Sequence, residues 1–365
     1  MDSINKNIVF VSMSDAGNGA EKVMLMAAAV SKAPMIFLTK VAVDGLCLPA
    51  DQPAQFITSK GMIAGFLGLA NAIKKYRHDF TIIASHSYLS AYLGFLKRIG
   101  YIKSKLIVRE CTSVFTRFTG IKRWTYRIAY YLGYPAADLV ICQTDLMKAQ
   151  FISHVSYVKA HKVIVVENPV DITQNLLKAD VFVNDPDLDA EFICAAGRLI
   201  PEKGFSILIR AYSVIAKQYP ALKLLILGHG PDKANLIKLI YELGLERQII
   251  LKGRSDNPMP YFKRAKVCVV SSIKEGFPNV LLEMMSLNHV VVATLCAGGI
   301  ESIPGIYKAD VNNTDSLMLA IKDAIELHTP LKKNSTRRYL QNRQPEVFIS
   351  SILNTLSFRD LYSNC

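Results

Sequence analysis

The chain has 365 residues, 51% of them apolar and 20% charged, which is typical of globular proteins and excludes a disordered or fibrous chain. At about 150 residues per domain, this length predicts two domains or one large one. No segment approaches the roughly 18 consecutive apolar residues of a membrane-spanning helix, and the first residues lack the pattern of a signal peptide. The seven cysteines include no CxxC pair, which disfavours a zinc site or a disulfide framework. We therefore expect a cytoplasmic protein.

The net charge of +13 is unevenly distributed, because residues 1–170 hold 20 Lys and Arg against 10 Asp and Glu. The densest part, from Lys97 to Arg127, combines nine cations with interleaved aromatic residues and a single acid, Glu110. This pattern favours contact with an anionic membrane surface, and a simple solvated face is the competing interpretation. Nucleic acid is not expected as a partner, because no helix-turn-helix, zinc-finger or RNP pattern is present. We expect the protein to lie peripherally on the inner face of the cytoplasmic membrane.

Short β-branched segments alternate with helical patterns along the whole chain. The strands predicted in the first half are Asn7–Ser12, Met35–Leu38, Phe80–Ala84, Lys105–Val108, Leu139–Cys142 and Val163–Val166. A turn at residues 168–171 and a polar, acidic linker at 172–190 follow. The strands predicted in the second half are Phe192–Ala195, Leu222–Leu227, Ile249–Leu251, Val267–Val270 and Val290–Ala293. Helices are predicted between them, over Gly204–Lys217 and Asp232–Leu243, and again near the end, over Val347–Phe358.

Strands that alternate with helices predict parallel sheets covered by helices on both faces. Two such series, separated by the polar linker, indicate an α/β protein of two doubly wound, Rossmann-like domains, residues 1–170 and 171–345. The final helix, within 346–365, is expected to cross back to the first domain. Ligands of such folds bind at the carboxyl ends of the strands, so we expect the site in the cleft between the domains.

The densest chemical pattern is SSIKEGFPNVLLE, residues 271–283, directly after a predicted strand. Pro278 suits the first turn of a helix, whose free N–H groups favour anionic or hydroxyl-rich ligands. Gly276 lets the backbone approach a ligand closely. Glu275 precedes the helix and Glu283 lies within it, so the two carboxylates can bind hydroxyl groups at two ends of one elongated ligand.

Two further patterns are typical of phosphate binding. Arg198 and Lys203 lie in the loop after the strand at 192–195, where two cations can clamp a diphosphate. The glycine-rich loop DAGNGAEK, residues 15–22, opens a helix as phosphate-binding loops do. It is neither GxGxxG nor a Walker sequence, so dinucleotide or ATP sites of those kinds are not supported.

Together with NPVD at 168–171 and GHGP at 228–231, these segments resemble family-4 glycosyltransferases, retaining enzymes with two facing Rossmann-like domains (the GT-B architecture). The resemblance covers nearly the whole chain, and EGFPNVLLE at 275–283 is its most specific part. Segments such as RECT at 109–112 resemble bacterial members that extend lipid-linked glycans with UDP-N-acetylhexosamines.

The resemblance implies roles for individual residues. Arg198 and Lys203 are expected to hold the donor diphosphate and stabilise the leaving group, and Glu275 to contact the donor sugar; these three are the expected catalytic residues. Glu283 is expected to bind the ribose hydroxyls. The other expected donor contacts are Gly19, Gly253, Arg254, Gly276, Phe277, Pro278, Asn279 and Val280. Electrostatic stabilisation of a clamped phosphate needs neither a metal ion nor another cofactor, so none is expected.

The chain departs from the family in the first domain. Many members have a histidine in the loop after the fourth strand, where this chain has Glu110 and Cys111. His86, which follows the strand at 80–84, is an alternative polar contact in the cleft, together with Arg109 and Glu110; an ordinary structural histidine is the competing interpretation. Asn18-Gly19 also replaces two adjacent glycines of the family loop.

The expected activity is the transfer of a hexose or N-acetylhexosamine from a nucleotide-sugar, expected to be UDP-linked, to a lipid-linked or polysaccharide acceptor. The anomeric configuration would be retained, and the product would serve bacterial surface-glycan synthesis. Two alternatives stay open: a UDP-sugar epimerase or hydrolase on the same fold, and a non-catalytic basic module that binds an anionic polymer.

Overall fold

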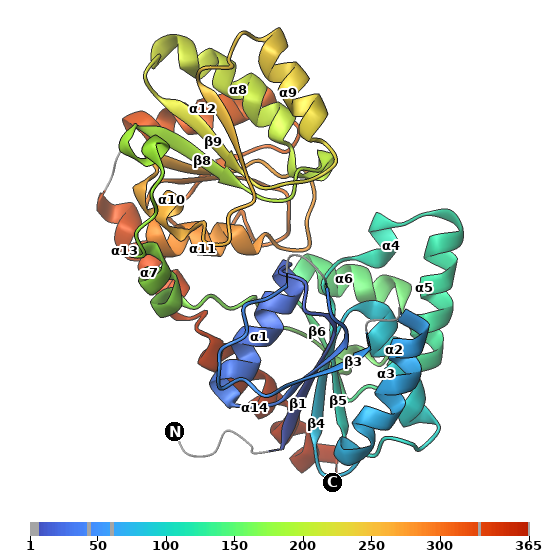
Figure 1. The fold of residues 1–365 in the computed structure, drawn as a ribbon. Coiled ribbons are helices and arrows are strands. Elements are labelled where there is room, and N and C mark those ends of the chain that lie inside the picture. The colour runs from blue at the N-terminus through green and yellow to red at the C-terminus, as the bar shows by residue number, and fades with distance from the viewer. Residues whose placement is uncertain (1–6, 42–44, 59–61, 328–329, 364–365) are drawn as a thin grey trace. The chain divides into compact units, whose positions relative to one another are not determined.

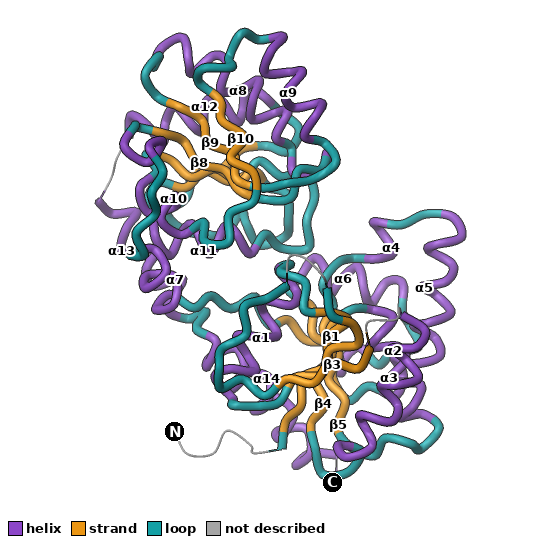
Figure 2. The backbone as a smooth tube through the Cα atoms, in the orientation of Figure 1, coloured by secondary structure: helices purple, strands orange, loops and turns teal. Residues whose placement is uncertain are grey.

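The computed structural model describes residues 7–41, 45–58, 62–327 and 330–363. The chain forms two compact units: unit 1 comprises Met1–Pro169 with Pro345–Cys365, and unit 2 comprises Val170–Gln344. Each unit is built on one parallel sheet, of seven strands in unit 1 and six in unit 2 (Figure 2). The prediction of two parallel-sheet α/β domains is confirmed. The chain passes between the units twice, one residue before each of the two boundaries expected from the sequence.

Unit 1 has the strand order β3-β2-β1-β4-β5-β6-β7. Its elements, in chain order, are β1 (Ile8–Ser14), α1 (Gly19–Ser31), β2 (Met35–Thr39), β3 (Ala54–Thr58), α2 (Met62–Ala72), η1 (Ile73–Tyr76), β4 (Thr81–Ser85), α3 (Ser87–Arg98), β5 (Lys105–Arg109), α4 (Val114–Arg117), α5 (Gly120–Gly133), η2 (Tyr134–Ala136), β6 (Leu139–Cys142), α6 (Asp145–His154), η3 (Ala160–Lys162), β7 (Val163–Val165) and α14 (Pro345–Ser363). The strand β3 was not predicted. It pairs only with β2 at the sheet edge, where less burial is needed to form a strand.

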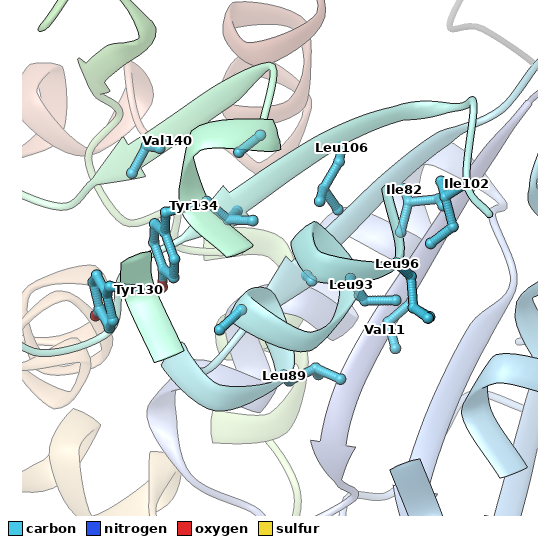
Figure 3. Close-up of a cluster of buried hydrophobic side chains, with 14 of the residues drawn as sticks. Val11, Ile82, Leu89, Leu93, Leu96, Ile102, Leu106, Tyr130, Tyr134 and Val140 are labelled. Carbon is cyan, nitrogen blue, oxygen red and sulfur yellow. The ribbon is translucent and has the colours of Figure 1, made fainter. Parts of the chain in front are cut away.

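Helices cover both faces of the unit 1 sheet because successive strand side chains point to opposite faces. Val9 and Val11 of β1 face one core together with α2, α3, α5 and α6, whereas Ile8 and Phe10 face the other with α1 and α14. Figure 1 shows α2, α3 and α5 on one side of the sheet and α1 and α14 on the other. The last helix of the chain therefore completes unit 1. Figure 3 shows part of the first core, where leucines of α3 (Leu89, Leu93 and Leu96) lie beside the strands.

Unit 2 has the strand order β10-β9-β8-β11-β12-β13. Its elements are α7 (Ile172–Ala179), η4 (Pro186–Asp189), β8 (Phe192–Ala196), η5 (Pro201–Lys203), α8 (Phe205–Gln218), β9 (Lys223–Leu227), α9 (Lys233–Glu242), β10 (Ile249–Gly253), α10 (Met259–Arg264), β11 (Val267–Val270), α11 (Asn279–Leu287), β12 (Val291–Thr294), β13 (Tyr307–Ala309), α12 (Thr314–Glu326) and α13 (Pro330–Gln341). α8, α9 and α12 share one core, and α7, α10 and α11 share the other.

The prediction of a polar linker at residues 172–190 is wrong. This segment holds α7 and η4 and belongs to unit 2. Two of its acidic residues share one lysine: Lys252 Nζ of β10 lies 2.7 Å from Asp185 Oδ2 and 3.0 Å from Asp187 Oδ2. Burial raises the pKa of both carboxyls, but hydrogen bonds from lysines outweigh it, and the net pKa of each is lowered. The acidic composition of residues 172–190 suggested a solvent-exposed linker. In the structure, Lys252, which is distant in the sequence, neutralises the charges of Asp185 and Asp187.

Within the described ranges, no helix combines the length and the apolar character that crossing a bilayer requires.

Candidate active site

The loops after β8, β9 and β10 of unit 2 are joined by backbone hydrogen bonds at the carboxyl ends of these strands. The Gly197 N–H donates to Leu227 O at 2.9 Å, and the Gly228 N–H donates to Gly253 O at 2.6 Å. Gly228 has a φ of 146°, and a Cβ there would lie 1.8 Å from Gly197 O. Only glycine allows this approach, so Gly228 is what lets the two loops lie this close together.

Lys203 and Glu275 form the central charge pair of this edge. Lys203 Nζ lies 2.8 Å from Glu275 Oε1, and the Ser272 hydroxyl donates to the same oxygen. The side chains are 20% and 16% exposed, so the pair is partly shielded from water. The Ser271 hydroxyl donates to Lys203 O at 2.9 Å, and the Glu275 N–H donates to Cys296 O at 2.9 Å. The loops after β8, β11 and β12 are thus held together around the pair.

A second cation and a helix terminus lie in the same loops. Arg198 is exposed, and its side chain makes no hydrogen bond or ion pair with the parts of the chain that the structure describes. The helix α11 begins at Asn279, with Pro278 preceding it as the N-cap. The positive end of its dipole adds to Arg198 and Lys203. The edge can therefore bind an anion, while Glu275 offers an acceptor for hydroxyl groups.

The remaining donor-site candidates of unit 2 occupy these loops and the helix that follows. Glu283 is the fifth residue of α11 and is half-buried. Arg254 directly follows β10, and its Nη2 lies 3.2 Å from Asp256 Oδ1. Phe277 is different, because its ring is buried and lies 5.5 Å from the Arg343 guanidinium. The Phe277 side chain packs against Arg343, just after the end of α13, so only the Phe277 backbone is available to a ligand.

In unit 1, His86 lies at the carboxyl end of β4, and Gly19 opens α1 after β1. His86 Nε2 is 3.2 Å from Oε1 of the buried Glu21, and the Ser85 hydroxyl is 3.2 Å from His86 Nδ1. The φ of His86 is 80°, a conformation that non-glycine residues avoid. Such backbone strain concentrates at functional positions, which is a structural reason to keep His86 as a candidate site residue.

Arg109 lies at the end of β5 and is 1% exposed. Its Nη2 donates to Asn168 Oδ1 at 2.6 Å, and its Nη1 lies 3.3 Å from Cys111 Sγ. Asn168 in turn donates to Gln143 Oε1 at 3.2 Å. Arg109 therefore connects β5 to the last residues of unit 1 before the chain passes to unit 2.

Glu110 is buried, and the hydroxyls of Tyr130 and Tyr134 of α5 and η2 donate to its two carboxylate oxygens. Burial raises the pKa of Glu110 to about 7, although the tyrosine hydrogen bonds act in the opposite direction. Figure 3 shows the two tyrosine rings beside each other at the edge of the core. Because both oxygens have partners, the carboxylate fastens α5 to the end of β5.

Sequence reasoning assigned no role to Glu21, Ser272 or Asn168, although each makes a contact to a candidate residue. All three lie inside the segments that carried the family resemblance.

Two family models match the chain. The one described as Glycosyltransferase Family 4 matches residues 39–174, and the one described as Glycosyl transferases group 1 matches residues 178–343. The two matches fall on the two units.

Among curated relatives, an N-acetylgalactosamine-N,N'-diacetylbacillosaminyl-diphospho-undecaprenol 4-alpha-N-acetylgalactosaminyltransferase from Campylobacter jejuni is 30% identical over 241 residues, 64% of each chain. The lipopolysaccharide core biosynthesis glycosyltransferase LpsE from Rhizobium meliloti is 28% identical over 61% of this chain and 62% of its own. An uncharacterized glycosyltransferase from Methanocaldococcus jannaschii is 34% identical over 47% of this chain. The matches to the Campylobacter and Methanocaldococcus proteins span 64% and 43% of those proteins' lengths.

Solved structures share the fold. HepE from Anabaena, crystallised in complex with UDP, has a TM-score of 0.80 and 19% identity over 96% of this chain and 99% of its own. A sucrose-phosphate synthase from Thermosynechococcus elongatus has a TM-score of 0.77 and 17% identity over 98% of this chain and all of its own. With family matches on both units and these relatives, the chain belongs to glycosyltransferase family 4, as the sequence motifs predicted.

Proposed function

We propose that the protein transfers a hexose or N-acetylhexosamine from a UDP-linked donor to a lipid-linked or polysaccharide acceptor in bacterial surface-glycan synthesis. The observation that carries the proposal is the pairing of Lys203 with Glu275 across two loops of unit 2, with the exposed Arg198 five residues before Lys203 in the same loop. The relatives support the acceptor class, because their names refer to a diphospho-undecaprenol glycan and to lipopolysaccharide core. The UDP complex of HepE supports the choice of nucleotide.

The charge pair suits a sugar diphosphate. Lys203 Nζ and Glu275 Oε1 are 2.8 Å apart, so a phosphate oxygen bound to the lysine and a sugar hydroxyl bound to the carboxylate would be neighbours. In a nucleotide-sugar, the sugar ring and the phosphate are joined through the anomeric oxygen, so the two groups lie next to each other. Arg198 supplies a second positive charge for the diphosphate, and Glu283 is placed one helical turn into α11 for the ribose hydroxyls.

The proposed reaction needs no metal ion. The bond from the anomeric carbon to the phosphate oxygen breaks as the acceptor hydroxyl bonds to the same face of that carbon, and the departing phosphate takes the hydroxyl proton. UDP and the retained glycoside are the products. Lys203 and Arg198 stabilise the negative charge that develops on the phosphate, which is the electrostatic contribution that such sites make.

Calorimetric binding of UDP tests the donor site. Lys203→Met or Arg198→Met removes a charge-assisted hydrogen bond worth about 1.5–3 kcal/mol, so each should weaken UDP binding about tenfold or more. Lys266→Met is the matched control, because Lys266 pairs with Glu191 at the opposite end of β11. If the three variants bind UDP alike, the proposed site is wrong.

Product analysis separates the alternatives. A transferase releases UDP from UDP-hexosamine or UDP-hexose mainly when acceptor is present, a hydrolase releases it without acceptor, and an epimerase releases none. If the protein were instead a non-catalytic module that binds an anionic polymer, Glu275→Gln would leave its function unchanged. Activity that persists in excess chelator, and an anomeric NMR signal matching that of the donor, are expected for a metal-independent retaining enzyme.

Peripheral attachment to the inner face of the cytoplasmic membrane is part of the proposal, since a lipid-linked acceptor would be reached there.

A further inference from the structure

The helix α5 carries a stripe of exposed apolar side chains. Five large hydrophobic residues of this helix are between 38% and 83% exposed: Ile121, Trp124, Ile128, Tyr131 and Leu132. Positions 121, 124, 128 and 131 follow the three- and four-residue spacing of one helix face. Tyr130 and Gly133, on the other side of the helix, are fully buried. The helix thus has a core-facing side already filled and a second apolar side that faces outward.

Positive charge surrounds this stripe. The helix contains Lys122, Arg123 and Arg127 and no acidic residue. Over the whole segment from residue 61 to residue 137, twelve Lys and Arg residues stand against two acids, Asp79 and the buried Glu110. This segment includes α2, α3 and α5, which share one face of the unit 1 sheet.

The helix is held firmly in place. A Cβ on Gly133 would lie 2.0 Å from Ala91 O of α3, so the two helices touch along their backbones. Tyr130 and Tyr134 anchor the end of α5 to Glu110, as described above. Beside the stripe, a groove of about 350 Å³ is lined by Arg127, Ile128, Tyr131, Leu132, His154 and Tyr157. The backbone that carries the apolar stripe is therefore packed firmly against unit 1 at its carboxyl end.

We propose that α5 docks the protein onto an anionic lipid bilayer, with Ile121 and Trp124 entering the acyl boundary and Lys122, Arg123 and Arg127 contacting lipid phosphates. This deepens the proposed function and rests on it for the lipid-linked acceptor. Aromatic and aliphatic residues combined with cations are typical of helices that lie in the membrane interface. A second copy of the chain is a poorer occupant, because it would bring the same cations into opposition.

Trp124 is the only tryptophan in the chain and lies in the stripe, so intrinsic fluorescence reports on docking directly. With vesicles of phosphatidylglycerol and phosphatidylcholine in 0.1 M salt, we expect its emission to shift to shorter wavelength and to be quenched by brominated acyl chains. At 1 M salt the Debye length falls from about 10 Å to about 3 Å, so binding should weaken strongly. An unchanged spectrum, or equal binding to pure phosphatidylcholine, would overturn the proposal.

Vesicle flotation with variants localises the surface. Ile121→Ser combined with Trp124→Ser should reduce the bound fraction at least tenfold, and Arg127→Gln about fivefold, since each cation near the surface adds about that factor. The matched control is Ile237→Ser combined with Tyr241→Ser on α9 of unit 2, where the side chains are 50% and 74% exposed. Equal flotation of both double variants would show that α5 is not the docking element.

UDP calorimetry keeps the two proposals separate. The α5 double variant should bind UDP like the wild type, because unit 2 is untouched and exposed positions were changed. If the wild type floats with vesicles but does not bind UDP, the proposed function is wrong and the proposal for the docking helix is still supported. UDP binding without flotation would refute the docking helix alone.

Discussion

His86 offers a test of backbone strain at a candidate site. Its φ of 80° and ψ of 126° lie in a region that glycine enters easily and other residues avoid. His86→Gly and His86→Ala both remove the imidazole and its contact with Glu21, so that loss cancels when the two variants are compared. What differs between them is the cost of holding this conformation.

The expected difference follows from two opposing terms. Alanine keeps the strain of the left-handed region, roughly 1–3 kcal/mol, whereas glycine relieves it. Glycine in turn loses more conformational entropy on folding, about 0.5–1 kcal/mol. The balance leaves His86→Gly more stable than His86→Ala by about 1 kcal/mol. For a unit of this size, that corresponds to about 2–4 °C in the midpoint of thermal unfolding.

Thermal unfolding followed by circular dichroism measures this difference. Ala149, exposed on α6 of the same unit, provides the control, because Ala149→Gly in a regular helix should lower the stability by about 0.5–1 kcal/mol. The expected order is therefore opposite at the two positions. If His86→Ala is as stable as His86→Gly or more so, the inference of strain is refuted.

Three further predictions concern other charged groups. Burial raises the pKa of Glu110 to about 7 in the folded state, above the unfolded value of about 4.3, so the folded state keeps a proton longer and its stability falls as pH rises between these values. Urea unfolding at pH 5 and pH 8 should show this decrease for the wild type but not for Glu110→Gln, and equal pH dependence would contradict it. Lys252→Met leaves Asp185 and Asp187 without their shared cation and should lower the free energy of unfolding by about 1–3 kcal/mol, measured in urea at neutral pH; a loss below 0.5 kcal/mol, about what an exposed pair contributes, would count against it. Glu283→Gln should weaken UDP binding about tenfold by calorimetry, since it removes the charge from the expected ribose contact, and an unchanged Kd would reject that role.

The central strands of both sheets could be predicted because they are short, β-branched and buried on both faces, as β4 and β11 are. β3 and β13 were missed because each pairs along one side only and carries polar residues. The acidic segment before β8 was misjudged because its lysine partner lies on β10, and such long-range pairing is invisible in local composition.

For the candidate site, too, the sequence indicated some features and not others. The motif at 275–283 singled out Glu275, but not its pairing with Lys203, which depends on how β8 and β11 lie side by side. Likewise, nothing in the sequence around Glu110 indicates that two tyrosines of α5 and η2 occupy its carboxylate. Motifs located the residues, and the packing of the sheet decided what each one touches.

The return of α14 to unit 1 has a consequence for how the protein is made. Phe348, Ile349 and Ile352 complete the core beneath α1, so unit 2 is in effect an insertion within unit 1. During synthesis, unit 2 emerges from the ribosome whole while unit 1 still lacks its closing helix. The amino-terminal part of the protein, although translated first, therefore reaches its finished core last.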